Sequence, residues 1–400
     1  MAERFSALFA RIQDNALRHE HEQSLPYDEV RWLAEAGFGA LRLPEAEGGG
    51  GVSVAEFFAL LTDLAAADSN QPQIWRNHIA FVEDRLQPQP VGRNQYWRKQ
   101  VASGAVIGGA WSERGTRSHL DMATELSHPD GSSVLNGVKY YSTGSNFADW
   151  ISVAAKRDGD PGGVIALVDA RAPGVAVADD WSGFGQRTTG SGTSMFATVA
   201  VEDAGIFAFS ERAPYQESVY QLVHVATLAG IARAAHRDAI SHLRKRARAY
   251  GHGLSDIPRD DAQLQAVVGR VGALAASAEA SVARAARYLD AAASAAIEDR
   301  EEAAVTAAVH EAAVAVYEAQ ITATDEALAA ATVLFDALGS SALDISLALD
   351  RHWRNARTIT SHNPRVYKER LVGAWHLNGT PPVVYGGEKP AADGARPSES

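Results

Sequence analysis

The segment that ends at Pro364 carries the densest group of side chains that could bind a ligand or move a proton. Residues 349–364 hold three arginines, two histidines, two asparagines and a tryptophan. Because the residue before a proline is pushed out of the helical region, a helix is predicted to end near His362 and Asn363. A helix end gathers side chains and unpaired backbone groups at one point, and a histidine titrates near neutral pH. The segment is therefore predicted to form a binding site, the alternative being a polar contact between helices or subunits.

The residues of this segment also resemble a known family. Arg354-Asn355-Ala356-Arg357 looks like the Arg-Asp-Ala segment of acyl-CoA dehydrogenases, which leads into a loop with a catalytic glutamate. Here Asn363 stands roughly where that glutamate would be, and His362 is beside it. Arg-Asn-Ala-Arg-Thr followed by His and Pro is similar to the flavin-dependent monooxygenases on this fold, the dibenzothiophene monooxygenase group. The resemblance implies that the base of the dehydrogenases is lost and that His362 is catalytic.

Composition excludes several classes of protein. The 400 residues are 46% hydrophobic and 22% charged, which is typical of a globular chain with two or three subdomains. The absence of cysteine removes disulfides, thiolate catalysis and zinc–thiolate sites. A net charge of −12 argues against nucleic acid or an anionic membrane as the main partner. No apolar run approaches 18 residues and the first residues lack the apolar core of a signal peptide, so a cytoplasmic protein is expected.

The order of the predicted elements gives a fold class. Apolar residues at helical spacing predict a helical domain over residues 1–105, and short β-rich runs predict a β domain over 106–215. Long alanine-rich helical patterns predict a bundle over 216–385, with breaks near residues 251–253, 299 and 339. Residues 386–400 are polar and are expected to form a disordered tail. This α+β order resembles the acyl-CoA dehydrogenase fold: a helical domain, a central β-barrel domain and a four-helix bundle.

Two motifs in the β domain are similar to the family's flavin-contacting segments. Ala110-Trp111-Ser112-Glu113 resembles the segment in which an aromatic residue and a Ser or Thr flank the flavin, which implies Trp111 and Ser112. Lys139-Tyr140-Tyr141-Ser142-Thr143 resembles the strand whose hydroxyl lies beside the reactive edge, which implies Thr143. Each motif alone could be a β-turn. The Gly-rich residues 181–193 are expected to be a structural turn, because no helix start follows them.

The phosphate of the cofactor is expected at another helix end. Arg248-Ala249-Tyr250-Gly251 resembles the family's Arg-x-Phe-Gly, whose arginine binds the cofactor, often across a subunit boundary. The family's Gln and Gly-Gly, which hold the pyrophosphate of FAD, here read Asp336 to Ser340, with only Gly339 and Ser340 left as candidate phosphate ligands. An added carboxylate and a missing glycine favour FMN, with FAD possible. The reach of Arg248 to a neighbour's flavin implies a homotetramer or at least a dimer.

His78 is a further candidate, in Gln73-Ile74-Trp75-Arg76-Asn77-His78. The oxygenase relatives carry a histidine near the active site here, so His78 is predicted to be catalytic together with His362 and Thr143. The alternative is a histidine packed in the core.

The resemblance implies a two-component monooxygenase. Reduced FMN would come from a separate flavin reductase and react with O2 to a C4a-(hydro)peroxyflavin, which would oxygenate an aromatic or heteroatom-containing substrate (S, N or an indole-type carbon). One alternative is an acyl-CoA dehydrogenase or desaturase that uses Glu311, Glu318 or Asp325 as its base. The other is a non-catalytic flavin-binding relative.

Overall fold

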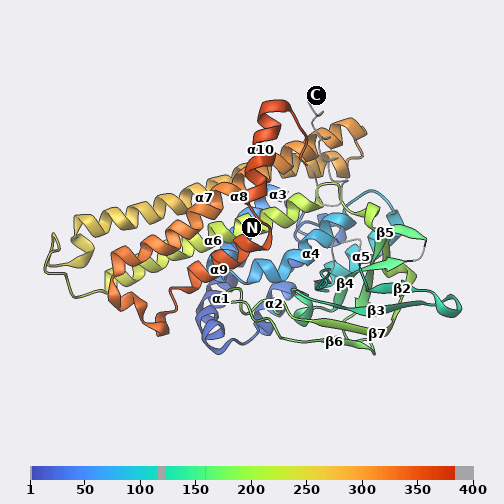
Figure 1. The fold of residues 1–400 in the computed structure, drawn as a ribbon, viewed down its shortest axis with the longest axis horizontal. Coiled ribbons are helices and arrows are strands. Elements are labelled where there is room, and N and C mark those ends of the chain that lie inside the picture. The colour runs from blue at the N-terminus through green and yellow to red at the C-terminus, as the bar shows by residue number, and fades with distance from the viewer. Residues whose placement is uncertain (1, 116–121, 158, 383–400) are drawn as a thin grey trace, which may run out of the picture.

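The computed structural model describes residues 2–115, 122–157 and 159–382. Helices come first along the chain, a β-sheet follows, and a long helical bundle completes the fold (Figure 1). The sheet lies at one end of the molecule, and the bundle extends away from it to the other end. The predicted tail at 386–400 lies outside the described residues. The α+β fold class is thus confirmed, with the strands grouped in the middle of the chain between two helical parts.

Five α-helices form the N-terminal part: α1 (Ala2–Glu22), α2 (Tyr27–Glu35), α3 (Val54–Ala67), α4 (Gln71–Arg85) and α5 (Val91–Ala102). The glycine run between α2 and α3 folds back on the chain before it. A Cβ on Gly49 would lie 2.1 Å from the Leu43 carbonyl oxygen, so no larger residue fits there. Ser53 then starts α3 with a capping box, because its hydroxyl accepts from the Glu56 N–H and the Glu56 carboxylate accepts from the Ser53 N–H.

Eight strands form one mixed sheet in the order β6-β7-β3-β2-β4-β5-β8, with β1 beside β4. Most pairs are antiparallel, while β1 and β2 run parallel to β4. The apolar faces of the strands enclose a second core around Leu135, Ile151 and Val199. The strands are β1 (Ile107–Ala110), β2 (Glu125–Ser127), β3 (Ser133–Lys139), β4 (Trp150–Arg157), β5 (Asp160–Asp169), β6 (Val175–Val177), β7 (Ser194–Val201) and β8 (Ile206–Ala208).

The bundle is built from α6 (Gln216–Lys245), α7 (Ala262–Ile297), α8 (Glu302–Leu338), α9 (Arg351–His362) and α10 (Val366–Asn378). The helix breaks fall at the predicted places, after α6, at Asp299 and at Gly339. Many of the side chains between α6, α7 and α8 are alanines, which lets the helix backbones come close together. As predicted, α9 ends at His362 with Asn363 in an extended conformation before Pro364.

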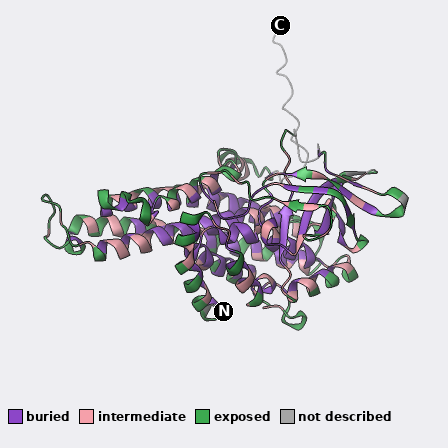
Figure 2. Cartoon of the chain, turned by 90° about the horizontal axis from the view of Figure 1, so that it is seen from below, coloured by how far each residue is buried: buried purple, intermediate pink, exposed green. Residues whose placement is uncertain are grey.

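One continuous apolar core joins the N-terminal helices to the bundle, because α3 packs against α6 and α7. Buried segments run from this junction into the sheet (Figure 2). Helix α7 is long and apolar enough to cross a membrane, which is weak evidence by itself. It packs against α6 and α8 along one side, and Arg284 on it pairs with Glu318 of α8, so we describe it as a bundle helix.

Candidate active site

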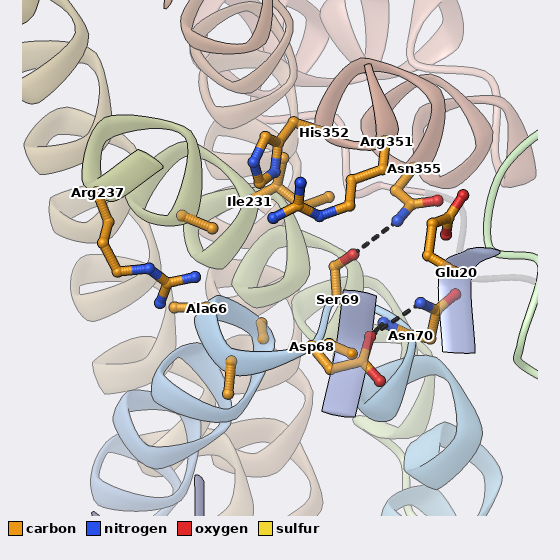
Figure 3. A pocket seen from close by; sticks show the side chains of 14 residues that line it. Glu20, Ala66, Asp68, Ser69, Asn70, Ile231, Arg237, Arg351, His352 and Asn355 are labelled. Atoms are coloured by element: carbon orange, nitrogen blue, oxygen red, sulfur yellow. Dashed lines mark hydrogen bonds between the residues drawn. The ribbon is translucent and has the colours of Figure 1, made fainter. Parts of the chain in front are cut away.

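Helix α9 is fixed in place by one buried side chain, Asn355. Its Oδ1 accepts from the Gln186 N–H at 2.7 Å, and its Nδ2 donates to the Ser69 hydroxyl at 2.9 Å. Figure 3 shows the bond between Asn355 and Ser69, which lies between α3 and α4. Gln186 belongs to the Gly-rich loop of the β domain, so Asn355 holds three parts of the chain together. In the same loop, a Cβ on Gly185 would lie 2.2 Å from the Arg354 carbonyl oxygen. The segment 181–193, predicted to be a structural turn, therefore packs against α9 and bonds to it.

A buried ionic group secures the start of the same helix. Asp238 on α6 accepts from Arg351 at 2.7 Å and from His352 at 2.9 Å. Burial alone would raise the pKa of Asp238, but the hydrogen bond and charges of His352 and Arg351 hold it well below its usual range. A cavity of about 20 Å³ beside this group has room for about one water molecule (Figure 3). The start of α9 is thus a structural region, and a substrate does not fit in this cavity.

The other end of α9 brings His362 against a second histidine. The rings of His362 and His224 of α6 lie 4.7 Å apart, and the His224 Nε2 is 3.0 Å from the Gln73 Oε1 of α4. Surrounding protein and the Arg76 charge lower the pKa of His362 to about 3. The His362 side chain is exposed within one chain. Because its pKa is lowered, the His362 imidazole is neutral at pH 7, and it is open to a ligand.

Arg76 and Asn77 of α4 connect this histidine pair to the β domain. The Arg76 guanidinium lies 4.3 Å from the centre of the Tyr220 ring, and its Nε donates to the Tyr220 carbonyl at 3.2 Å. The Tyr220 hydroxyl contacts Asn77 Oδ1 at 3.4 Å, and Asn77 Nδ2 donates to the Thr143 carbonyl at 3.3 Å. Helix α4 therefore places polar groups between His362 and Thr143.

Thr143 lies at the end of a chain of hydroxyl groups. Its Oγ1 is 2.7 Å from the Ser191 Oγ, which is 2.7 Å from the Thr189 Oγ1. Thr189 donates to the Gln186 carbonyl at 2.9 Å, in the loop that holds α9. A continuous set of hydrogen bonds therefore joins Thr143 to the loop that holds α9.

Trp111 lies beside Tyr220 and Asn77 and is the aromatic residue of the candidate site. Its ring packs edge-on against Tyr220 with centroids 6.3 Å apart, and both line a cavity of about 10 Å³ with Asn77. The backbone of the next residue, Ser112, pairs with Tyr140. Under this loop Lys139 donates to the Glu113 carboxylate at 2.7 Å. Burial disfavours the charged carboxylate, yet the hydrogen bonds from Lys139 and from backbone N–H groups lower the pKa of Glu113 to about 2.

His78 points into the core instead. Its Nδ1 accepts from the Ile107 N–H at 3.2 Å, and its Nε2 lies 3.0 Å from the Gly39 carbonyl oxygen. Burial lowers its pKa to about 4, so the ring is neutral and donates from Nε2. With both nitrogens engaged by backbone groups, this geometry corresponds to the packed-core alternative and does not bring His78 to His362.

Arg248, Gly339 and Ser340 lie together at the far end of the bundle. Arg246 donates to the Leu338 carbonyl at 3.3 Å and to the Arg248 carbonyl at 3.0 Å, which holds the two segments side by side. Arg248 and Ser340 are exposed. His224 and the end of α6 are 21 residues apart, which is about 31 Å along a helix. Within one chain, the predicted phosphate residues are therefore not brought to Thr143 and His362.

Asn363 and the three acids considered as alternative bases, Glu311, Glu318 and Asp325, make contacts of their own. The Asn363 carbonyl accepts from the Gln320 amide of α8 at 3.5 Å. Glu318 pairs with Arg284 and Asp325 with Arg365, while Glu311 is exposed. Glu318 lies between α7 and α10, and Glu311 and Asp325 are exposed. The described groups near His362 are His224, Arg76 and, through its charge on Arg76, Glu217 of α6.

The residues near Thr143 fit a flavin ring. Trp111 provides an aromatic face, and the hydroxyl of Thr143 and the imidazole of His362 provide hydrogen-bonding groups. The Oγ of Ser142, next to Thr143, is buried without a hydrogen-bond partner among the described residues.

Comparison with known proteins agrees with this geometry. Three family models match the chain: the acyl-CoA dehydrogenase N-terminal domain at residues 2–87, the middle domain at 108–199 and the C-terminal domain at 222–365. The chain belongs to the acyl-CoA dehydrogenase superfamily. The match to all three domains in order confirms the fold predicted from the sequence.

Individual relatives are oxygenases by name. The chain is 28% identical over 385 residues to a probable FMNH2-dependent monooxygenase SfnC of Pseudomonas putida, with 94% of each chain covered. It is 27% identical over 373 residues to a dibenzothiophene monooxygenase of Mycolicibacterium goodii, which covers 89% of this chain and 88% of that one. Among solved structures, methanesulfinate monooxygenase MsuC of Pseudomonas fluorescens has a TM-score of 0.85 at 26% identity, covering 95% and 97% of the two chains. TdsC of Paenibacillus sp. A11-2 with FMN and indole has a TM-score of 0.84 at 26% identity, covering 96% and 99%.

Four residues of the site were not predicted from the sequence: Arg76, Asn77, Tyr220 and His224. Gln73, Arg76 and Asn77 lie three and four residues apart and so share one face of α4, as Tyr220 and His224 share one face of α6. Polar residues at this spacing on two otherwise buried helices are the signal that could have identified them.

Proposed function

We propose that this protein is a two-component, flavin-dependent monooxygenase that uses reduced FMN delivered by a separate flavin reductase. The observation that carries the proposal is the pair of neutral histidines, His362 and His224, at the end of α9. They lie beside Asn363, which stands roughly where the dehydrogenases have their catalytic glutamate. The base that desaturation requires is therefore absent from that position. The FMN dependence in the name of one relative and the FMN bound to TdsC support the choice of cofactor.

The chain's residues hold and shield the reacting groups. Trp111 and Ser112 flank the flavin ring, and Thr143 bonds its polar edge. Reduced FMN, held by these residues, would supply the electrons for activating O2. His362 donates a hydrogen bond from its neutral imidazole at the reacting end, and His224, fixed by Gln73, orients it. The substrate is an aromatic or heteroatom-containing molecule, in line with the indole bound to TdsC.

We also propose that the working unit is an oligomer, a homotetramer by resemblance. Arg248, Gly339 and Ser340 are separated from Thr143 and His362 by most of the length of α6, so they can serve the phosphate of a flavin only in another copy. The outward surface of α7, which is apolar and mostly unburied within one chain, is suited to contact such a copy.

Stopped-flow mixing tests the activity directly. The purified chain with chemically reduced FMN is mixed with air-saturated buffer, and the absorbance of the C4a adduct is followed. We expect a long-lived adduct with FMN, and affinity for reduced FMN at least equal to that for reduced FAD. A preference for reduced FAD would contradict the cofactor assignment. Bleaching of bound oxidised flavin by an acyl-CoA would identify a dehydrogenase, and neither signal would leave a non-catalytic flavin-binding protein.

A further inference from the structure

Arg76 is a cation inside the candidate active site whose terminal nitrogens are unused. Only its Nε donates a hydrogen bond, to the Tyr220 carbonyl, and the guanidinium stacks on the Tyr220 ring. Nη1 and Nη2 have no acceptor within the described part of the chain. Arg42 and Arg354 instead pair with carboxylates, Glu83 at 2.7 Å and Glu20 at 2.8 Å. Arg76 is partly buried and its Nη atoms are not fully enclosed, so they are accessible to a ligand.

Three side chains close to Arg76 are uncharged. His224 and His362 are held neutral, in part by the positive charge of Arg76 itself. Burial raises the pKa of Tyr220, so its phenol also stays neutral. Glu217, nearly one turn before Tyr220 on α6, is the carboxylate whose field reaches Arg76, and it is engaged in an interaction of its own. Arg76 thus lies among neutral hydrogen-bonding groups and within the field of one carboxylate, Glu217.

We propose that the substrate carries an anionic group, a carboxylate, sulfinate or sulfonate, and that Arg76 binds it through Nη1 and Nη2. This inference rests on the proposed function and names its substrate class. The planar fork of a guanidinium matches two oxygens of such a group, and Tyr220 holds that fork in one orientation. Arg76 is beside the His224–His362 pair, at the end of the site where we propose the reaction takes place, so the anion is assigned to the substrate.

The test compares two probes of nearly the same shape, benzoate and benzamide, by calorimetric titration into the full chain saturated with FMN. We expect benzoate to bind roughly tenfold more tightly, the effect of one charge-assisted hydrogen bond pair. Arg76→Met should remove this preference, and Arg76→Lys should retain part of it, because lysine keeps the charge and loses the fork. The matched control is Arg18→Met, at an exposed position on α1, which should leave the preference unchanged.

Two results would overturn the proposal. One is the absence of a preference for benzoate in the unaltered protein, whether both probes bind or neither does. The other is an Arg76→Met variant that keeps the preference and instead loses affinity for reduced FMN, which would assign Arg76 to the flavin. If Arg76→Met does not fold, Arg76→Gln is tested instead. The proposal then requires that Arg76→Gln loses the preference for benzoate. Because binding is measured without turnover, a missing oxygen adduct would refute the monooxygenase and leave this result standing.

Discussion

Removing the Asn355 side chain should weaken the junction of the three parts of the molecule. Asn355→Ala leaves the buried Gln186 N–H without an acceptor and removes the bond to Ser69. An unpaired buried donor costs about 1–3 kcal/mol, and a lost hydrogen bond about 0.5–1.5 kcal/mol. The free energy of unfolding should therefore fall by roughly 2–4 kcal/mol. Since α9 ends at His362, product formation per O2 consumed should fall as well.

Urea unfolding at one fixed protein concentration measures this loss. Ser69→Ala removes only the Nδ2 bond and should cost about 1 kcal/mol. The double variant should cost less than the two single changes added together, with a coupling energy of about 0.5–1.5 kcal/mol, because both changes remove the same bond. An Asn355→Ala protein whose free energy of unfolding stays within about 0.5 kcal/mol of the parent's would refute the view that this residue ties α9 in place.

The histidines give three further predictions. His362→Ala should lower product formation by roughly 100- to 10,000-fold while FMN affinity changes little, with O2 released as hydrogen peroxide; coupled turnover near the parent's rate would reduce His362 to a helix terminus. His78→Ala should lower the free energy of unfolding by roughly 2–4 kcal/mol, since two backbone groups lose a buried partner, and the folded fraction should keep its coupling; the reverse pattern would return His78 to the catalytic group. The hydrogen bond to Glu29 raises the pKa of His19 above 6.5. This pair therefore contributes its full stabilisation below pH 6.5, and the contribution is lost as pH rises through the pKa of His19 in the folded protein. Unfolding curves across this pH range should show the loss in the parent and not in His19→Gln.

The sequence could predict the elements whose signals are local. Pro364 stopped α9 where expected, the glycine run folded back between α2 and α3, and the breaks in the bundle fell at Gly339 and Asp299. Helix α10 was missed as a separate element, because of its side chains only Lys368 is buried and no apolar stripe marks it. Packing of α10 against α8, and not its own pattern, supports it.

The site was predicted only in part, for a geometric reason. The sequence led to α4 through His78, but residues two positions apart on a helix are about 200° apart around its axis. Arg76 therefore faces the site while His78 faces the core. His224 lies within a long apolar helix and carries no local signal. Its importance comes from a contact with a residue 138 positions later, which periodicity does not report.

The length of α6 has a consequence for mixtures of variants. If the phosphate ligand Arg248 and the reacting residue His362 serve flavins in different copies, neither has to be intact in the same chain. His362→Ala and Arg248→Met proteins, each inactive alone, should then regain part of their activity when they are dissociated and reassembled together. Some sites in the mixed assembly receive Arg248 from one chain and His362 from the other. A single site built within one chain could not be rescued in this way.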